Sequence, residues 1–231
     1  MERSRPSRIL LLIPHLGGGG AERVMELLAR FLNSERFEIH LCLVSESCPK
    51  AIKLPPSVTI HELGASRVRY GAFSLLRLVW RIRPDVVLSG IAHLNLLILT
   101  LRQFLPRNTR ILVRQNGELI ATLAAGFHRR IYAVAYRRAD RIICQTDSMA
   151  REIHDQLQVL PRKLVVLRNP IPLERLRESD STTRSPWTGS GPNILAVGRL
   201  TPEKGFDLLL EAFAALAVPY FGAELVIASP T

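Results

Sequence analysis

Four consecutive glycines, Gly17 to Gly20, are the first residues in the chain whose type and spacing point to chemistry. They lie in the run PHLGGGGAER of residues 14–23, between a short apolar segment and a helical pattern. Glycines at such a turn let the backbone approach a ligand, and the following helix offers free N–H groups and the positive end of its dipole. The turn therefore predicts binding of a phosphate or a sugar hydroxyl. A tight turn that binds nothing is the alternative.

Two better-known glycine motifs do not fit this turn. A dinucleotide fingerprint requires a third glycine where Glu22 stands. A P-loop requires Gly-Lys-Ser or Gly-Lys-Thr, which the sequence lacks. The glycines are therefore those of neither motif.

A basic pair, Arg199 and Lys204, stands in a second turn, the run VGRLTPEKG of residues 197–205. A positioned arginine and lysine can stabilise the negative charge of a phosphate group without a metal. The sequence contains no Asp-x-Asp, the usual metal–diphosphate motif. We therefore expect no metal, and a solvated turn is the alternative for the pair.

Polar residues also follow two expected strands, at the ends where open α/β sheets bind ligands. His93 comes after Leu88-Ser89-Gly90, and Arg114, Asn116 and Glu118 lie in the run VRQNGE of residues 113–118. The side chains of this run can bind a sugar by hydrogen bonds. For His93 alone, a loop or core histidine is an equally good interpretation.

The elements that must position these residues alternate between short apolar runs and helical periods. This alternation predicts a doubly wound, mainly parallel Rossmann-like α/β sheet whose strands are buried on both faces. Phe73, Leu76 and Trp80 recur at helical spacing and predict a helix that ends before Arg83-Pro84. Seven strands are expected at residues 8–13, 37–44, 58–63, 85–88, 110–113, 141–144 and 164–167, with further helices near 91–105, 126–138 and 147–157.

The composition changes after this domain, at residues 170–192, which contain four prolines and a Ser/Thr run and are expected to form a linker. The alternation then restarts with a strand at 193–197, a turn at 198–205, a helix at 206–216 and a strand at 224–227. Two strands and a helix cannot bury both faces of a sheet. We therefore expect a complete domain over 1–169, a linker over 170–192, and a truncated second domain over 193–231.

Four runs in this order resemble the retaining, two-Rossmann-domain (GT-B) glycosyltransferases of family 4. LGGGGAERV at 16–24 resembles their N-terminal signature, and VGRLTPEKG at 197–205 resembles the opening of their donor domain. RADRII at 138–143, followed by Ser148, is similar to their last-strand region, and NPIPL at 169–173 to their interdomain hinge. The resemblance covers nearly the whole chain.

The resemblance implies transfer of a hexosyl unit from a UDP- or GDP-linked sugar to a glycan or lipid-linked acceptor, with retention, as in polysaccharide biosynthesis. It implies that the donor diphosphate is bound by Arg199, Lys204, Gly18 and Gly19. We place the acceptor beside His93, Arg114, Gln115, Asn116 and Glu118. Gln115 stands where the family often carries a histidine, and a glutamine cannot titrate. No residue is assigned as catalytic.

The family's donor-binding pair of glutamates, with seven residues between them, normally lies beyond the region that this chain covers. Glu203 and Glu211 have the same spacing, but we interpret both as surface residues. We therefore expect the 231-residue chain to be inactive by itself. The alternatives are a non-catalytic acceptor-side module that binds carbohydrate or lipid, and an inactive fragment. A sugar-nucleotide epimerase or dehydrogenase fits less well, because the sequence has no Tyr-x-x-x-Lys.

The composition restricts which binding partners and which cellular compartment are expected. The net charge of +11 comes with no Lys/Arg run longer than two residues and no aromatic-interleaved basic stripe, which argues against nucleic acid. Three cysteines without metal-ligand spacing fit a reducing cytoplasm. The helix at 127–138 carries Arg129, Arg130, Arg137 and Arg138, which could hold the enzyme peripherally on the inner face of an anionic membrane. A core-packed helix with solvated arginines is the favoured alternative.

Overall fold

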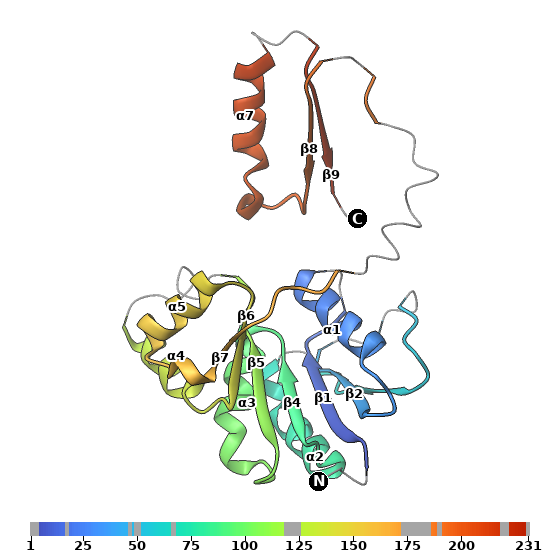
Figure 1. The fold of residues 1–231 in the computed structure, drawn as a ribbon, viewed down its shortest axis with the longest axis vertical. Helices are drawn as coiled ribbons and strands as arrows, with labels where there is room; N and C mark the ends of the chain where they lie inside the picture. The colour runs from blue at the N-terminus through green and yellow to red at the C-terminus, as the bar shows by residue number, and fades with distance from the viewer. Residues whose placement is uncertain are drawn as a thin grey trace. The chain divides into compact units, whose positions relative to one another are not determined.

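The computed structural model describes residues 5–16, 19–45, 48, 52–65, 68–117, 126–171, 186–188, 191–217 and 222–229. The chain divides into two compact units, Met1–Ile171 and Pro172–Thr231 (Figure 1). The division falls within the segment that was expected to be a linker.

The first unit is built on a seven-stranded sheet with the order β3-β2-β1-β4-β5-β6-β7. Every ladder in it is parallel, so the carboxyl ends of all the strands meet at one edge. The predicted Rossmann-like α/β fold is confirmed. The strands are β1 (Ser7–Ile13), β2 (Phe37–Leu43), β3 (Val58–Glu62), β4 (Val86–Ser89), β5 (Arg110–Arg114), β6 (Arg141–Cys144) and β7 (Leu164–Val166).

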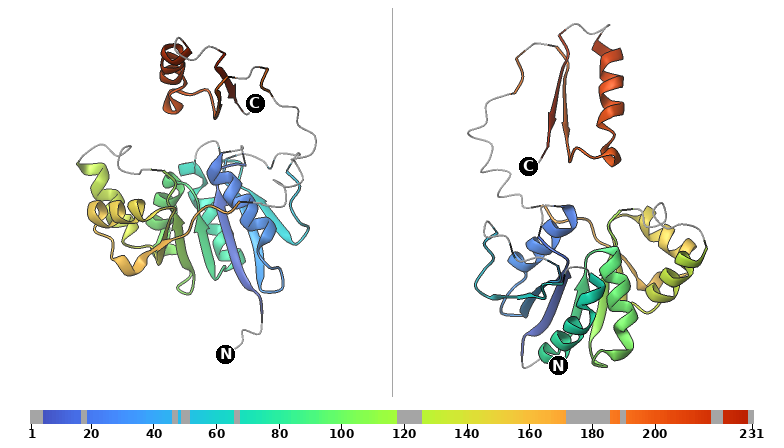
Figure 2. Two further views of the ribbon diagram at one scale, coloured as in Figure 1. Left: turned by 45° about the horizontal axis from the view of Figure 1, so that its top comes forward. Right: turned by 180° about the vertical axis from the view of Figure 1, so that it is seen from behind.

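Helices cover the two faces of this sheet unequally. Met25 and Ala29 of α1 pack with Leu11 and Ile13 on one face. The other helices pack on the opposite face, around Leu10 and its neighbours, and the rear view in Figure 2 brings α2 and α3 forward. The helices are α1 (Gly20–Phe31), α2 (Ala72–Ile82), α3 (Ala92–Thr100), α4 (Phe127–Tyr136) and α5 (Asp147–Leu157), with 3₁₀ turns η1 (Val68–Gly71), η2 (Leu101–Phe104) and η3 (Pro161–Lys163).

The strand order reverses between β1 and β4, because the chain crosses to β2 and β3 before it returns. In an open α/β sheet, ligands bind outside the carboxyl ends of the strands at such a switch point. The glycine turn after β1 and the residues after β4 flank this position.

One expectation about burial is wrong. Strand β3 is not buried on both faces: Thr59, Ile60 and Glu62 are exposed, because β3 is an edge strand with only β2 beside it. The predicted helix α2 forms, but Phe73 and Trp80, which marked it, are 70% and 47% exposed. The core contacts of α2 come instead from an aliphatic stripe at helical spacing: Leu75, Leu78, Val79 and Ile82.

The second unit contains β8 (Asn193–Val197), η5 (Pro202–Lys204), α7 (Phe206–Ala217) and β9 (Glu224–Ala228), with β8 and β9 paired in parallel. None of its described residues is buried. Leu195, Val197 and Leu208 are each more than half exposed, as expected when one helix and two strands leave a sheet face uncovered.

One carboxylate ties three segments of the first unit together at the edge opposite the switch point. Asp140 accepts hydrogen bonds from Arg102 Nη1 at 2.5 Å, from Arg102 Nη2 at 3.0 Å and from the Ile111 N–H at 2.7 Å. Burial alone would raise the pKa of Asp140, but these hydrogen bonds outweigh it and lower the pKa below its ordinary value. Ionised Asp140 therefore stabilises the junction of η2, β5 and β6.

We expect Asp140→Ala to lower the free energy of unfolding by about 1–3 kcal/mol, because it removes a charged acceptor from three donors. A carboxyl with a lowered pKa contributes stability above its unfolded pKa of about 3.9 and loses it as the pH falls through the folded value. The variant should therefore lose less stability on acidification than the wild type. Urea titrations at several pH values test this, with the exposed Asp155→Ala as the control. Equal effects of the two substitutions would contradict it.

Candidate functional site

The polar residues at the carboxyl edge of the first sheet come from segments that are far apart in the sequence. They follow successive strands, whose arrowheads point the same way in Figure 1. The residues are His15 after β1, His93 after β4, Arg114 to Asn116 at the end of β5, Gln145 after β6 and Asn169 after β7.

Arg114, the last residue of β5, is buried, with only 3% of its surface exposed. Its guanidinium donates hydrogen bonds to Asn116 Oδ1 and to Asn169 Oδ1. Burial lowers the pKa of Arg114, although a guanidinium is still protonated at neutral pH. No carboxylate within the described ranges forms an ion pair with it. Its partners are neutral amides, so a buried positive charge is left without an opposite charge there.

Asn116 connects the ends of three neighbouring strands. Its Nδ2 donates to the carbonyl oxygen of Gly90 after β4, and its Oδ1 also accepts from Gln145 Nε2 at 3.1 Å. A Cβ at position 90 would collide with Met25 of α1, so glycine there allows α1 to pack close to the end of β4. Asn116 is half-buried and lies between the switch point and β6.

The side chain of Gln115 points into the core, where a series of hydrogen bonds holds it in place. Tyr136 Oη donates to Gln115 Oε1 at 2.8 Å, and Gln115 Nε2 donates to the Gly117 carbonyl at 3.3 Å. Asn95 Nδ2 donates to Tyr136 Oη at 3.3 Å and to the Arg114 carbonyl at 3.0 Å. Both ends of the Gln115 amide are therefore occupied inside the protein. In this structure Gln115 orients the segment, and its contact with an acceptor stays a prediction.

His93 lies exposed in the first turn of α3. Desolvation of its ring, followed by the nearby charge of His15, lowers the pKa of His93. Neutral imidazole carries one hydrogen-bond donor and one acceptor, so it can either donate a hydrogen bond to a sugar hydroxyl or accept one from it. His15 Nδ1 is buried without a partner among the described residues. The sequence interpretation gave His15 no role, and its place directly after β1 was the signal that could have found it.

The glycine turn is described only in part, since Gly17 and Gly18 lie outside the described residues. Gly19 is the N-cap of α1 with extended backbone. A Cβ there would collide with the carboxylate of Glu22, which lies against the start of the helix. A carboxylate at a helix N-terminus already offsets the dipole. This position therefore suits a hydroxyl donor better than a second anion, and the diphosphate role of Gly19 stays a prediction.

Arg199 and Lys204 lie exposed in the turn after β8 in the second unit. The Thr201 N–H donates to the Arg199 carbonyl at 2.8 Å, and the Lys204 N–H donates to the Thr201 carbonyl at 2.9 Å. Gly205 closes the turn in the left-handed region, with φ of +63°. The aliphatic stem of Lys204 packs against Gly198. The turn therefore carries both cations at the carboxyl end of β8.

Other expected residues have simpler outcomes. Glu118 lies outside the described residues, and the side chain of Glu203 is also not described. Glu211 is exposed on α7, as expected. The part of the chain that the structure describes contains no group of three His, Cys, Asp or Glu residues that could hold a metal ion.

The helix on which a membrane surface was expected, α4, exposes arginines and, among its described side chains, little large apolar surface. Tyr132 and Ala133 of α4 pack against the core, whereas Val134 is 53% exposed. Arg129 and Arg130 of α4, and Arg137 and Arg138 directly after it, are exposed. Within the described ranges no helix is long and apolar enough to span a bilayer.

Comparisons with known proteins agree with this architecture. The family model for Glycosyltransferase Family 4 matches residues 18–175. A protein of Campylobacter jejuni, N-acetylgalactosamine-N,N'-diacetylbacillosaminyl-diphospho-undecaprenol 4-alpha-N-acetylgalactosaminyltransferase, is 25% identical over 89% of this chain and 59% of its own length. D-inositol 3-phosphate glycosyltransferase of Geodermatophilus obscurus is 35% identical over 34% of this chain and 18% of its own length.

Two solved structures share the fold at low sequence identity. Anabaena Alr3699/HepE in complex with UDP and glucose has a TM-score of 0.64 at 14% identity, over 95% of this chain and 60% of that one. The lipopolysaccharide outer core galactosyltransferase WaaB has a TM-score of 0.66 at 15% identity, over 97% of this chain and 61% of that one. The present chain thus spans about three fifths of the length of most of these relatives.

We expect Tyr136→Phe to lower the free energy of unfolding by about 1–2 kcal/mol, because Gln115 Oε1 loses its buried donor. The amide signals of residues 114–117 should also shift in an NMR spectrum, since Gln115 anchors that segment. The matched control is Tyr132→Phe on the same helix, whose hydroxyl has no hydrogen bond with the described residues. If the two substitutions had the same small effect, the hydroxyl of Tyr136 would not position the site.

Proposed function

The chain belongs to glycosyltransferase family 4, and on that basis we propose that the protein transfers a hexosyl unit from a nucleotide-sugar to a glycan or lipid-linked acceptor. The observation that carries the proposal is the family match over residues 18–175. The group of polar side chains at the carboxyl edge of the first sheet supports the proposal, because sugars are bound by such convergent hydrogen-bonding groups.

For the donor, we propose a UDP- or GDP-linked sugar whose diphosphate is bound by Arg199 and Lys204. Two cations on one rigid turn suit a diphosphate that gains negative charge as it departs. Anabaena HepE, which shares the fold, was crystallised with UDP and glucose. Transfer without a metal ion and with retention of configuration belongs to the same proposal.

We expect Arg199→Ala and Lys204→Ala each to weaken binding of UDP or GDP by about tenfold or more, since each removes a charge-assisted contact. Isothermal calorimetry with both nucleotides measures this. The control is Arg151→Ala, an exposed cation on α5 of the first unit. Unchanged nucleotide affinity in both variants would refute the assignment.

For the acceptor, we propose that Arg114 binds an anionic group while His93, Asn116 and the glycine turn bind sugar hydroxyls. The support is the burial of the Arg114 charge among neutral amides, because a buried charge is costly unless an opposite charge accompanies it. The Campylobacter relative is named for a diphospho-undecaprenol acceptor and the Geodermatophilus relative for inositol 3-phosphate. A phosphorylated or diphospholipid-linked sugar therefore suits this end of the sheet, and such a lipid would place the protein peripherally on the inner face of the membrane.

We expect Arg114→Gln to abolish a preference for phosphorylated ligands. The wild type should bind a hexose 1-phosphate about tenfold or more tightly than the free hexose, whereas the variant should bind both alike. NMR titrations with the two sugars test this. Urea unfolding of the variant measures how much stability is lost with the contact to Asn169. Arg110→Gln, exposed at the start of the same strand, is the control. Equal affinities of the wild type for the two sugars would contradict the anionic acceptor.

A non-catalytic carbohydrate- or lipid-binding module is the second candidate. The observation that favours it is that the first unit has its own buried core and carries Arg114, Asn116 and His93 at one sheet edge. Glycan or liposome binding by residues 1–171 alone, without nucleotide binding by the whole chain, would favour this module over the transferase.

A further inference from the structure

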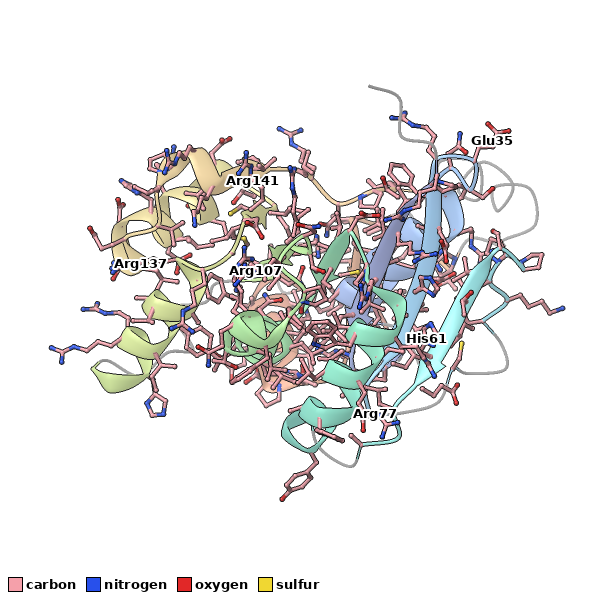
Figure 3. The ribbon with its side chains drawn as sticks, turned by 90° about the horizontal axis from the view of Figure 1, so that it is seen from below. Glu35, His61, Arg77, Arg107, Arg137 and Arg141 are labelled. Atoms are coloured by element: carbon pink, nitrogen blue, oxygen red, sulfur yellow. The ribbon has the colours of Figure 1, made fainter. Side chains whose placement is uncertain are left out.

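The outer side of α2 combines large exposed aromatic side chains with arginines. We define the α2 face as Phe73, Arg77, Trp80, Arg81 and Arg83, together with Phe104 of η2. Phe73 is 70% exposed, Trp80 is 47% exposed and Phe104 is 53% exposed. The three arginines are exposed as well. In Figure 3, Arg77 lies on α2 with its side chain pointing away from the sheet.

This exposure follows from how α2 packs. Its aliphatic stripe, Leu75, Leu78, Val79 and Ile82, is buried against the sheet. The aromatic residues therefore lie on the opposite side of the helix. Leaving large apolar surface in water costs free energy that burial against a partner would recover. Single exposed apolar residues are ordinary, but three aromatic side chains on one surface are not.

The α2 face is ordered before any partner binds. The Trp80 indole N–H donates to the Phe104 carbonyl at 2.8 Å, which ties α2 to η2. The Arg83 guanidinium lies 5.7 Å from the centre of the Trp80 ring, and Arg83 closes the helix with φ of +49°. The indole N–H is therefore satisfied within the protein, so the outer surface of the ring is available for apolar contact.

The charge of this region has one sign. Between Glu62 and Asp85 the sequence contains five arginines and no aspartate or glutamate. A surface that lacks acidic residues repels a second copy of itself and selects an anionic partner. By contrast, among the residues of α4 whose side chains are described, Val134 is the one large apolar side chain that is mostly exposed beside the arginines.

We propose that the α2 face is a docking surface for an anionic lipid bilayer. Aromatic rings and arginine stems enter the headgroup region of a membrane while guanidinium groups pair with lipid phosphates. A convex helix side with no acidic residues fits this planar interface. Gly71, the residue before α2, lies against Val44, which follows β2, so the start of α2 lies at the same sheet edge as the candidate site. Docking is independent of sugar transfer.

Vesicle co-sedimentation of the whole chain tests the charge requirement. We compare phosphatidylcholine vesicles with vesicles that also contain phosphatidylglycerol, and expect binding only to the second kind. Arg77→Glu/Arg81→Glu should reduce this binding by about tenfold or more, whereas Arg129→Glu/Arg130→Glu on α4, with the same change in charge, should reduce it much less. Equal losses in the two variants, or a larger loss in the α4 variant, would overturn the proposal.

A second measurement reports insertion directly and does not depend on the charge variants being folded. The chain has two tryptophans, so Trp187→Phe leaves Trp80 as the sole indole. Phosphatidylglycerol-containing vesicles with brominated acyl chains should quench its fluorescence, and Phe73→Ser should weaken that quenching. No quenching, or chain self-association through α2 in place of vesicle binding, would show that the α2 face does not dock on lipid.

Discussion

The buried guanidinium of Arg114 is the interaction on which the carboxyl edge of the first unit depends. It extends from the end of β5 across β6 to Asn169 after β7, and it also holds Asn116, which contacts the ends of β4 and β6. The polar side chains there are therefore positioned by one another as well as by the sheet. From the opposite face, Tyr136 and Asn95 secure the neighbouring Gln115 and the backbone of Arg114. A small polar region thus organises residues at the ends of four parallel strands, β4 to β7, and on two helices, α3 and α4.

The alternation of apolar runs with helical periods was enough to predict the sheet, because strands buried by helices on both faces need continuous apolar sequence. The face of α2 could not be predicted in the same way. Its aromatic and aliphatic residues both recur at helical spacing, and only packing shows that Leu75 and Ile82 are inside while Phe73 is outside. The exposure of β3 depends on strand order, which the periodicity does not contain.

The candidate site, too, could be predicted from the sequence only in part. The sequence placed Arg114 and Asn116 at the end of a strand, which is correct. It did not show that Arg114 would meet Asn169, 55 residues away, or that Asn95 would meet Tyr136, 41 residues away. Such contacts arise from the order of strands and from which side of β5 each residue faces. Alternation explains why adjacent Arg114 and Gln115 serve opposite faces.

Asn169 has a further consequence through the residues that follow it. Asn169 precedes Pro170, whose ring restricts both its own φ and the conformation of the residue before it. Arg114 thus holds a residue at which the described chain leaves the first sheet. An anion that competes with Asn169 for the guanidinium would release Asn169, and, by thermodynamic linkage, holding Asn169 in place would weaken binding of the anion to the same extent. Ligand occupancy at Arg114 and the position of Asn169 are therefore coupled in both directions.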